Sequence, residues 1–263
     1  MKLSIVIPVF NETKRIYKTF DALNAYTASY GFSLLEVIFV NDGSTDSTLS
    51  KLKEFKKTSK LPITIHSYTQ NKGKGNAVRI GMIESTGDFA LLCDADMSTP
   101  LSELKKLSKY AESNNDVIIG TRKNGRSTVL VHQPKFREFL GKGFTLITKI
   151  SLNLPVTDFT CGFKLFSRKA VVTIFNESVI NGWGYDAEIL YIAKKKRLFM
   201  VEKAVMWSDD KNTHVNILTA VPKTIYEIGK IISIHSILPK TQFIFSISTS
   251  FKQKIERIVS AGL

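Results

Sequence analysis

Two carboxylates spaced two residues apart are the first candidates for chemistry in this chain. Asp94 and Asp96 follow the short apolar run 89–93, and Pro100 comes four residues after the second of them. The run has the length of a buried strand, and side chains at i and i+2 of an extended backbone point the same way. Two carboxylates held side by side repel each other unless a cation lies between them. We interpret the pair as a site for Mg²⁺ or Mn²⁺ that also binds phosphate oxygens; the alternative is a solvated loop with two acids.

Apolar runs alternate with amphipathic segments over the first 120 residues. The amphipathic segments carry apolar residues at helical spacing, as in Ile16, Phe20 and Leu23. Alternating strands and helices predict an α/β fold: a Rossmann-like, mostly parallel mixed sheet with helices on both faces and right-handed crossovers. The predicted strands are residues 3–10, 34–40, 62–68, 89–94 and 117–120.

A polar cluster follows each of these predicted strands. Ligands of mostly parallel sheets bind at the carboxyl ends of the strands, so we expect the clusters to form one site. They are Asn11-Glu12, Asp42-Gly43, residues 71–75, Asp94 with Asp96, and Thr121-Arg122.

The alternation is less regular after Arg122. The glycine-containing stretch 123–132 predicts a loop, and 135–154 predicts a helix. Further on, the sequence predicts a turn and short strand at 158–166, helices at 171–175 and 185–197, and a final strand at 199–207.

The chain has 263 residues and a formal net charge of +14. That excess favours a polyanionic partner, which could be nucleic acid, an anionic membrane surface or a phosphorylated substrate. A lysine-rich surface without such a partner is the alternative. Cys93 and Cys161 lie far apart in apolar surroundings, which fits a reducing compartment. The first residues lack the pattern of a signal peptide, so we expect a protein that is not secreted.

We expect a main domain at residues 1–210 and a basic amphipathic helical tail at 211–263. Apolar residues at helical spacing, such as Ile225, Ile228 and Ile232, alternate with lysines and arginines in the tail. Such helices suit the plane of an anionic membrane, although a helix packed on the main domain has the same pattern. A spanning helix is not expected, because polar residues and Pro239 interrupt 231–251.

Five motifs in order resemble the family 2 inverting glycosyltransferases of the GT-A fold. They are residues 7–12, 40–46, 71–75, 94–96 and 158–166. The similarity covers roughly residues 2–207, and it is greatest to the polyprenyl-phosphate branch and its glucose-transferring dolichyl-phosphate members. The resemblance implies metal-dependent transfer of glucose from UDP-glucose to a polyprenyl phosphate, giving a β-linked product. The tail departs from those relatives that carry two membrane-spanning helices, so we expect peripheral or monotopic attachment to the cytoplasmic face of a membrane.

The resemblance implies that the N-terminal motifs bind the nucleotide. Asp42 could accept the imide N–H of uracil, with Gly43 beside it. The base and ribose pocket would be formed by Pro8, Phe10, Asn11 and Glu12. A helix-capping acid is the alternative reading of Glu12.

The resemblance also implies how the diphosphate is held. Lys72 and Lys74 would bind it from a loop in which Gly73 and Gly75 let the backbone amides approach. Asp94 would lie beside the nucleotide and Asp96 would coordinate the metal. The mannose-transferring relatives have a glutamine two residues after the second aspartate. Ser98 stands there in this chain, which leaves the third protein ligand open.

The candidates on the acceptor side are Arg122, Arg137, Asp158 and Asp186. The two arginines would hold the acceptor phosphate, since guanidinium binds phosphate through two parallel hydrogen bonds; Arg137 could equally be a surface residue of a helix. Asp158 is expected to face the acceptor and orient the sugar or assist the nucleophile. Asp186 is second for that role, and a helix cap is its alternative. An acceptor phosphate is already ionised near neutral pH, so a strong general base is hardly needed.

Other functions remain possible on the sequence. One is transfer of mannose from GDP-mannose, or transfer to a glycan. Another is a binding module, but no Gly-x-Gly-x-x-Gly follows the first strand as a dinucleotide site requires. The basic residues also lack the interleaved aromatics of nucleic-acid stacking surfaces, so we expect no nucleic acid partner.

Overall fold

The structure is a computed structural model that describes residues 1–27, 30–122, 129–131, 145–208 and 217–235. The chain divides into two compact units, Met1–Ile228 and Gly229–Leu263. The second unit includes the end of the last described helix, residues 229–235.

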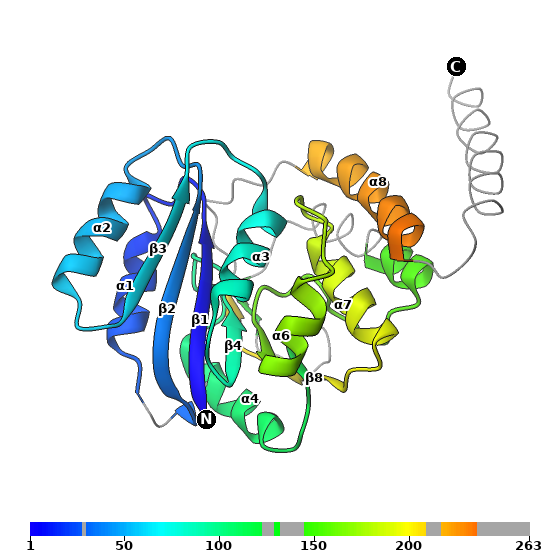
Figure 1. Cartoon of the computed structure of the whole chain (residues 1–263), viewed down its shortest axis with the longest axis horizontal. Helices are drawn as coiled ribbons and strands as arrows, with labels where there is room; N and C mark the ends of the chain where they lie inside the picture. Colours follow the sequence, from blue (N-terminus) through cyan, green and yellow to red (C-terminus); the bar gives the residue numbers. More distant parts are fainter. Residues whose placement is uncertain (28–29, 123–128, 132–144, 209–216, 236–263) are drawn as a thin grey trace. The chain divides into compact units, whose positions relative to one another are not determined.

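The first unit is built on a mixed sheet of seven strands (Figure 1). The strand order is β3-β2-β1-β4-β7-β5-β8, with β7 antiparallel to both of its neighbours and the other pairs parallel. The strands are β1 (Lys2–Val9), β2 (Ser33–Asp42), β3 (Ile63–Tyr68), β4 (Phe89–Leu92), β5 (Val117–Thr121), β7 (Lys164–Ser167) and β8 (Met200–Ala204). A separate parallel pair joins β6 (Val129–Val131) to β9 (Trp207–Ser208).

Helices cover both faces of this sheet. The helices of the described residues are α1 (Ile16–Asn24), α2 (Thr48–Thr58), α3 (Lys74–Glu84), the 3₁₀ turn η2 (Leu101–Glu103), α4 (Leu104–Ala111), α6 (Arg168–Phe175), α7 (Tyr185–Lys195) and α8 (Ile217–His235). Residues 145–152 are also helical. Within the described residues, no helix is both long enough and apolar enough to cross a bilayer.

The central strand β1 shows why the sheet needs helices on two sides. Leu3, Ile5 and Ile7 are fully buried with the apolar residues of α1, α2 and α4 on one face. Val6 points to the other face, where Gly81 of α3 lies so close that a β-carbon would come within 2.4 Å of the Val6 side chain. Successive strand residues alternate between the faces, and a strand buried on both faces is apolar throughout.

The predicted α/β fold with a mostly parallel mixed sheet and helices on both faces is confirmed. The structure corrects two local predictions. α3 begins at Lys74, so the second half of the predicted 71–75 loop is the first turn of a helix. The predicted final strand 199–207 is two strands, β8 and β9, in different sheets. The predicted turn and short strand at 158–166 are confirmed: this segment leads into β7, an interior strand that is antiparallel to both of its neighbours.

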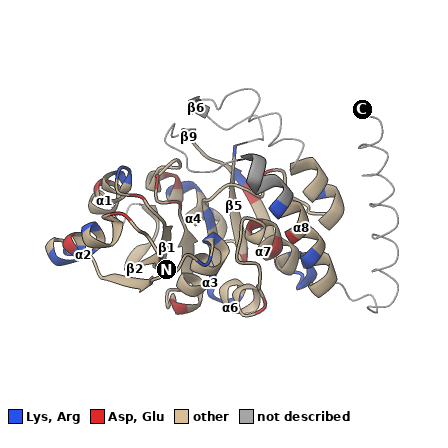
Figure 2. Cartoon of the chain, turned by 90° about the horizontal axis from the view of Figure 1, so that it is seen from above, with Lys and Arg blue, Asp and Glu red and all other residues tan. Residues whose placement is uncertain are grey.

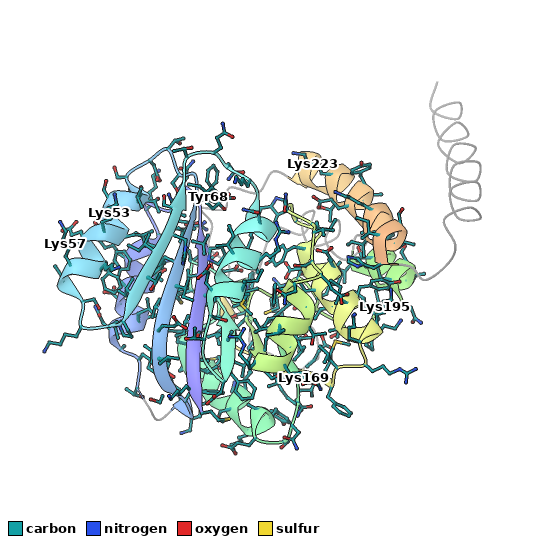
Figure 3. All side chains as sticks on the ribbon, in the orientation of Figure 1. Lys53, Lys57, Tyr68, Lys169, Lys195 and Lys223 are labelled. Carbon is teal, nitrogen blue, oxygen red and sulfur yellow. The ribbon has the colours of Figure 1, made fainter. Side chains whose placement is uncertain are left out.

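Surface lysines are distributed over several elements. Lys53 and Lys57 of α2, Lys169 of α6, Lys195 of α7 and Lys223 of α8 are exposed and point outward on different sides (Figure 3). Seen onto the C-terminal edge of the sheet, basic and acidic residues lie interspersed (Figure 2).

Candidate active site

The carboxyl ends of β1, β2, β4 and β5 lie at one edge of the sheet, at the top of Figure 1. Because β7 is antiparallel, the residues that precede it, 158–163, reach the same edge. The sequence clusters predicted to meet are thereby brought onto one edge.

Asp94 and Asp96 follow β4, but not in extended backbone. The amide of Met97 donates to the carbonyl of Asp94 at 3.2 Å, and Met97 has a φ of 51°. The pair therefore sits in a tight turn, and the expectation of two side chains projecting in parallel from a strand was wrong. The Asp94 carboxylate is 2.6 Å from the Lys74 ammonium, whereas Asp96 lies 3.6 Å from Arg15 and accepts the amide of Ser98 at 2.9 Å.

Lys74 lies at the centre of the charges in this site. Burial alone would lower the pKa of its ammonium, but the carboxylates of Asp94, Asp186 and Asp96 outweigh that effect and raise it. Burial likewise raises the pKa of Asp94, and Lys74, followed by Lys164 and Arg122, reverses this into a net lowering. Lys74 and Asp94 are therefore a charged pair at neutral pH.

The position of Asp94 depends on a glycine in the facing turn. A β-carbon on Gly162 would lie 1.9 Å from the Asp94 Oδ2 atom. Asp94 and Gly162 also line a small pocket of about 210 Å³, counting its open mouth. The remaining lining residues are Cys93, Ser98, Thr99, Phe163 and Trp207.

Asp42 holds the loop that leads into α3. Its carboxylate is almost fully buried and accepts the amides of Lys72 at 2.7 Å and Gly73 at 3.0 Å, and the Asn71 side-chain amide at 2.9 Å. Contact between Asp42 and a uracil base stays a prediction.

Gly43 and the glycines of residues 71–75, the Lys-Gly loop, serve close packing of the backbone. A β-carbon on Gly43 would lie 2.6 Å from the amide nitrogen of Asn71, and Gly43 has a φ of +67°. On Gly73 and Gly75, β-carbons would lie 2.4 Å and 2.3 Å from the carbonyl oxygens of Asn181 and Ile180. The amide of Gly75 already donates to the Asn181 carbonyl at 2.7 Å.

These bonds correct the predicted role of the loop amides. The amides of Lys72, Gly73 and Gly75 all donate to protein acceptors, so they do not point at a diphosphate. The side chains remain: the Lys72 ammonium is exposed and 5.2 Å from the ring centre of Tyr68, which Figure 3 labels at the end of β3. The Lys74 ammonium is 5.3 Å from the Trp183 ring and 5.9 Å from the Tyr185 ring.

The first motif lines the same edge. Pro8 is buried and Phe10 is 39% exposed. Asn11 has a φ of 54°, and its side-chain oxygen accepts the amide of Thr45 at 2.8 Å, which ties the first motif to the second. Glu12 does not cap α1 with its side chain. It binds Arg15 through two bonds of 2.7 and 2.6 Å, and Arg15 in turn faces Asp96.

Asp158 binds Arg122 through both carboxylate oxygens. The Nε and Nη2 atoms of Arg122 donate at 2.8 Å each, and the Arg122 amide donates at 2.9 Å. Asp158 has no exposed surface, whereas the Arg122 side chain is 21% exposed. Burial would lower the pKa of Arg122, but the hydrogen bond and charge of Asp158 raise it.

This pairing corrects the expectation that Asp158 faces the acceptor. Its carboxylate is enclosed and positions Arg122, which is the group that reaches solvent. Arg122 lies 5.1 Å from the ring centre of Trp207 and donates to Thr160 at 2.9 Å. Arg137, the other predicted phosphate-binding arginine, lies outside the described residues.

Asp186 lies in the first turn of α7, where it pairs with Lys164 of β7 at 2.5 Å. Lys164 is fully buried and also donates to the Cys161 carbonyl at 2.6 Å. Burial raises the pKa of Asp186 even though Lys164 opposes the effect. The expected helix cap was wrong for Asp186, since its side chain is engaged by Lys164 and not by a backbone amide of the described helix start.

Sequence reasoning missed four charged residues that support this site. Arg15 joins Glu12 to Asp96, Lys164 holds Asp186, and Glu202 of β8 accepts the amides of Thr157 and Asp158 at 2.8 Å. Glu227 of α8 accepts the amide of Gly184 at 2.7 Å. A lysine inside an otherwise apolar strand was the one visible signal, since a buried lysine needs a partner.

Comparison with known proteins shows which family has this arrangement. The profile described as "Glycosyl transferase family 2" matches residues 4–175. The chain belongs to glycosyltransferase family 2. It is therefore a nucleotide-sugar glycosyltransferase, as the motifs indicated.

Individual relatives within this family match most of the chain. The dolichyl-phosphate beta-glucosyltransferase of Saccharomyces cerevisiae is 36% identical over 224 residues, covering 79% of this chain and 67% of that protein. The human protein of the same name is 31% identical, covering 79% of this chain and 68% of the relative. The chain thus spans about two thirds of the length of these curated relatives.

Solved structures show the same fold at low identity. Glucosyl-3-phosphoglycerate synthase from Mycobacterium tuberculosis, crystallised with Mn²⁺, UDP and glucosyl-3-phosphoglycerate, superposes with a TM-score of 0.66. It is 18% identical, and the match covers 90% of this chain and 81% of the other. The GT-A fold of this family 2 glycosyltransferase is thereby confirmed.

Proposed function

We propose that this family 2 glycosyltransferase transfers glucose from UDP-glucose to a polyprenyl phosphate of the dolichyl type, with inversion at the anomeric carbon. The observation that carries the proposal is the ion pair between Asp94 and Lys74, 2.6 Å apart, at the sheet edge where Arg122 also follows β5. A transfer between two phosphate-bearing substrates needs cations on both sides of the sugar. The names of the curated relatives support the same donor sugar and acceptor.

The residues of the turn after β4 fit a divalent ion. Asp94 and Asp96 offer hard oxygen ligands, and no group of three or more His, Cys, Asp or Glu side chains able to hold a metal occurs in the described part of the chain. Mg²⁺ commonly binds through one or two carboxylates, with substrate phosphates and water as the other ligands. A bound Mg²⁺ or Mn²⁺ would neutralise the charge that develops on the leaving diphosphate. Lys74 and Lys72 add positive charge beside it.

On the acceptor side, Arg122 is the group suited to align the nucleophile. Asp158 holds its guanidinium from behind, while Nη1 makes no hydrogen bond within the described residues. A phosphate oxygen held there would form the bond to the anomeric carbon as the bond from that carbon to the diphosphate breaks. Since the phosphate is already ionised, alignment and charge neutralisation supply most of the catalysis.

The proposal includes a membrane surface as the place of reaction. The acceptor has a long apolar chain, and the α8 segment carries the basic amphipathic pattern that suits an anionic lipid surface. We assign the transfer to residues 1–210 and membrane association to residues 211–263. The attachment would be peripheral or monotopic, on the cytoplasmic face.

A donor-by-acceptor assay tests the proposal. Purified full-length protein with Mg²⁺ or Mn²⁺ is given UDP-glucose or GDP-mannose, and polyprenyl phosphate in anionic vesicles or a free glycan. The expected result is a glucosyl phosphate lipid from UDP-glucose alone, with the sugar β-linked, and no product after chelation of the metal. Labelling of the lipid from GDP-mannose alone would overturn the donor assignment. Labelling of the glycan and not the lipid would overturn the acceptor assignment.

A further inference from the structure

The loop at residues 181–184, Asn-Gly-Trp-Gly, separates the Lys-Gly loop from helix α8. On one side its Asn181 carbonyl accepts the amide of Gly75, and no β-carbon fits on Gly73 or Gly75 against it. Arg79 of α3 also donates to the Asn181 side chain at 3.0 Å. The 181–184 loop is therefore packed directly onto the start of α3, the turn that contains Lys74.

The same loop supplies the aromatic surroundings of Lys74. The Lys74 ammonium lies 5.3 Å from the ring centre of Trp183 and 5.9 Å from that of Tyr185, the first residue of α7. A cation is attracted to the face of an aromatic ring at such distances. A shift of the 181–184 loop would move both the backbone under Lys74 and the rings beside its ammonium.

Glu227 of α8 holds this loop from the opposite side. Its Oε2 atom accepts the amide of Gly184 at 2.7 Å. A β-carbon on Gly182 would lie 2.1 Å from the other oxygen, Oε1, and a β-carbon on Gly184 would lie 2.9 Å from Oε2. Both glycines thus make room for one carboxylate. Gly184 also precedes α7, where the positive end of the helix dipole favours a negative group.

We propose that Glu227 is a positioning residue for the donor diphosphate. It fixes the 181–184 loop, the loop fixes the start of α3, and Lys74 is thereby held at its ion-pair distance from Asp94. The inference rests on the proposed function, because it takes the diphosphate of the donor as the group that Lys74 meets. It adds that α8, the first helix of the basic tail, contributes to donor binding through the 181–184 loop.

The direct test measures binding of UDP in the presence of Mn²⁺ by titration calorimetry, with full-length protein and no acceptor. Glu227→Ala is expected to weaken UDP binding about ten-fold, the size of effect of one charge-assisted hydrogen bond. Glu227→Gln keeps an oxygen for the Gly184 amide and should restore most of the affinity. Tyr226→Ala, at a neighbouring position of α8 that is 75% exposed, is the matched control and should leave affinity unchanged.

Two further variants separate positioning from a general loss of stability. Gly182→Ala introduces a methyl group that displaces the Glu227 carboxylate from the loop side, so it should reproduce the effect of Glu227→Ala. In a protein that already carries Lys74→Ala, Glu227→Ala should have little further effect. In steady-state assays, KM for the donor should rise while KM for the polyprenyl phosphate stays constant. Equal UDP affinity of wild type and Glu227→Ala would overturn the inference and leave the proposed function intact.

Amide hydrogen exchange, measured without nucleotide, tests whether Glu227 fixes the 181–184 loop and the start of α3. Residues 181–185 and 72–76 should exchange faster in Glu227→Ala than in wild type, while β1 and β2 keep their protection. Unchanged exchange in both segments would overturn the inference by itself. Absence of UDP binding to the wild-type protein would instead overturn the donor assignment, which makes the two failures distinguishable.

Discussion

Asp158 and Arg122 form a two-bond ion pair in which the carboxylate is fully enclosed and the guanidinium keeps one side toward solvent. The two residues are 36 positions apart, and Glu202 holds the backbone of Asp158 from a third strand. Asp158 thus fixes the Nε and Nη2 side of the guanidinium, and the other side remains available to a ligand. Fixed in this way, an arginine loses little freedom when it binds an anion.

Asp158→Asn should therefore weaken binding of the acceptor more than binding of the donor. The substitution removes the charge that orients Arg122, so KM for the polyprenyl phosphate should rise about ten-fold or more while UDP affinity stays near wild type. Unfolding in urea should show a loss of about 2–3 kcal/mol, because a buried charge-assisted pair is broken. Arg122→Lys keeps the charge and loses the paired bonds, and it should show the same KM effect. An unchanged acceptor KM in both variants would contradict this role.

Asp96→Asn should abolish the response to divalent ions. Asp96 is partly exposed and lies in a turn, so its substitution should leave the fold intact while turnover falls about 100-fold or more. The stabilisation of the protein by Mn²⁺ with UDP, measured as a shift in Tm, should also disappear. Asp88→Asn is the control, because Asp88 is exposed and bonds the amide of Lys2 at the start of β1, the opposite end of the sheet. A normal Mn²⁺ response in Asp96→Asn would exclude it as a metal ligand.

The Lys74–Asp94 pair predicts how the free energy of unfolding depends on pH in the acidic range. The pKa of Asp94 is lowered from its ordinary value of 3.8, so its contribution is present above pH 3.8 and is lost as the pH falls through the lower folded value. In Lys74→Met the burial effect remains and the main opposing charge is gone, so the folded pKa rises. Urea denaturation just below pH 3.8 should then show a shallower loss of stability in the variant. The slopes of the free energy of unfolding against pH should differ by only a fraction of about 1.4 kcal/mol per pH unit, which is the limit for one proton. The difference is smaller than that limit because Asp94 is about a third exposed.

Lys72→Met is the control for this experiment. Lys72 is the exposed lysine of the same loop, and its ammonium lies 5.2 Å from the centre of the Tyr68 ring. Its replacement should leave the acid limb of the stability curve as in wild type. Identical acid limbs for wild type and Lys74→Met would contradict the pairing.

Gly162→Ala tests whether the turn after Asp158 sets the position of Asp94. The added methyl group would lie 1.9 Å from the Asp94 carboxylate, so the carboxylate must move. Turnover should fall about ten-fold or more, with weaker binding of UDP and Mn²⁺. The matched control is Gly229→Ala in α8, where a β-carbon meets no described atom within 4 Å. That control should be active and slightly more stable, because alanine favours a helix over glycine by up to about 1 kcal/mol. Full activity of Gly162→Ala would exclude this role for the turn.

The sequence predicted the convergence of the strand-end clusters but not the contacts inside it. Asp94, Lys74 and Arg122 were all expected at one edge, because parallel strands bring their carboxyl ends together whatever their exact pairing. The reversed direction of β7 has no local signal, and it decides that Asp158 meets Arg122. Similarly, the glycines of the Lys-Gly loop suggested open amides, while the structure uses them to accommodate the carbonyls of Ile180 and Asn181 from a segment about 100 residues further on. Such long-range pairings depend on the assembled fold, and a pattern of neighbouring residues does not contain them.

The reversed strand has one more consequence. β4 and β5 do not pair with each other, and β7 is the strand that hydrogen-bonds to both. Without β7 the sheet would consist of two separate parts. One is β3-β2-β1-β4, which carries Asp42 and Asp94, and the other is β5-β8, which carries Arg122. Neither half could then keep its register on the other. The donor-binding and acceptor-binding halves of the sheet are thus expected to unfold together. Partial unfolding should then not leave an enzyme that still binds one substrate and hydrolyses it.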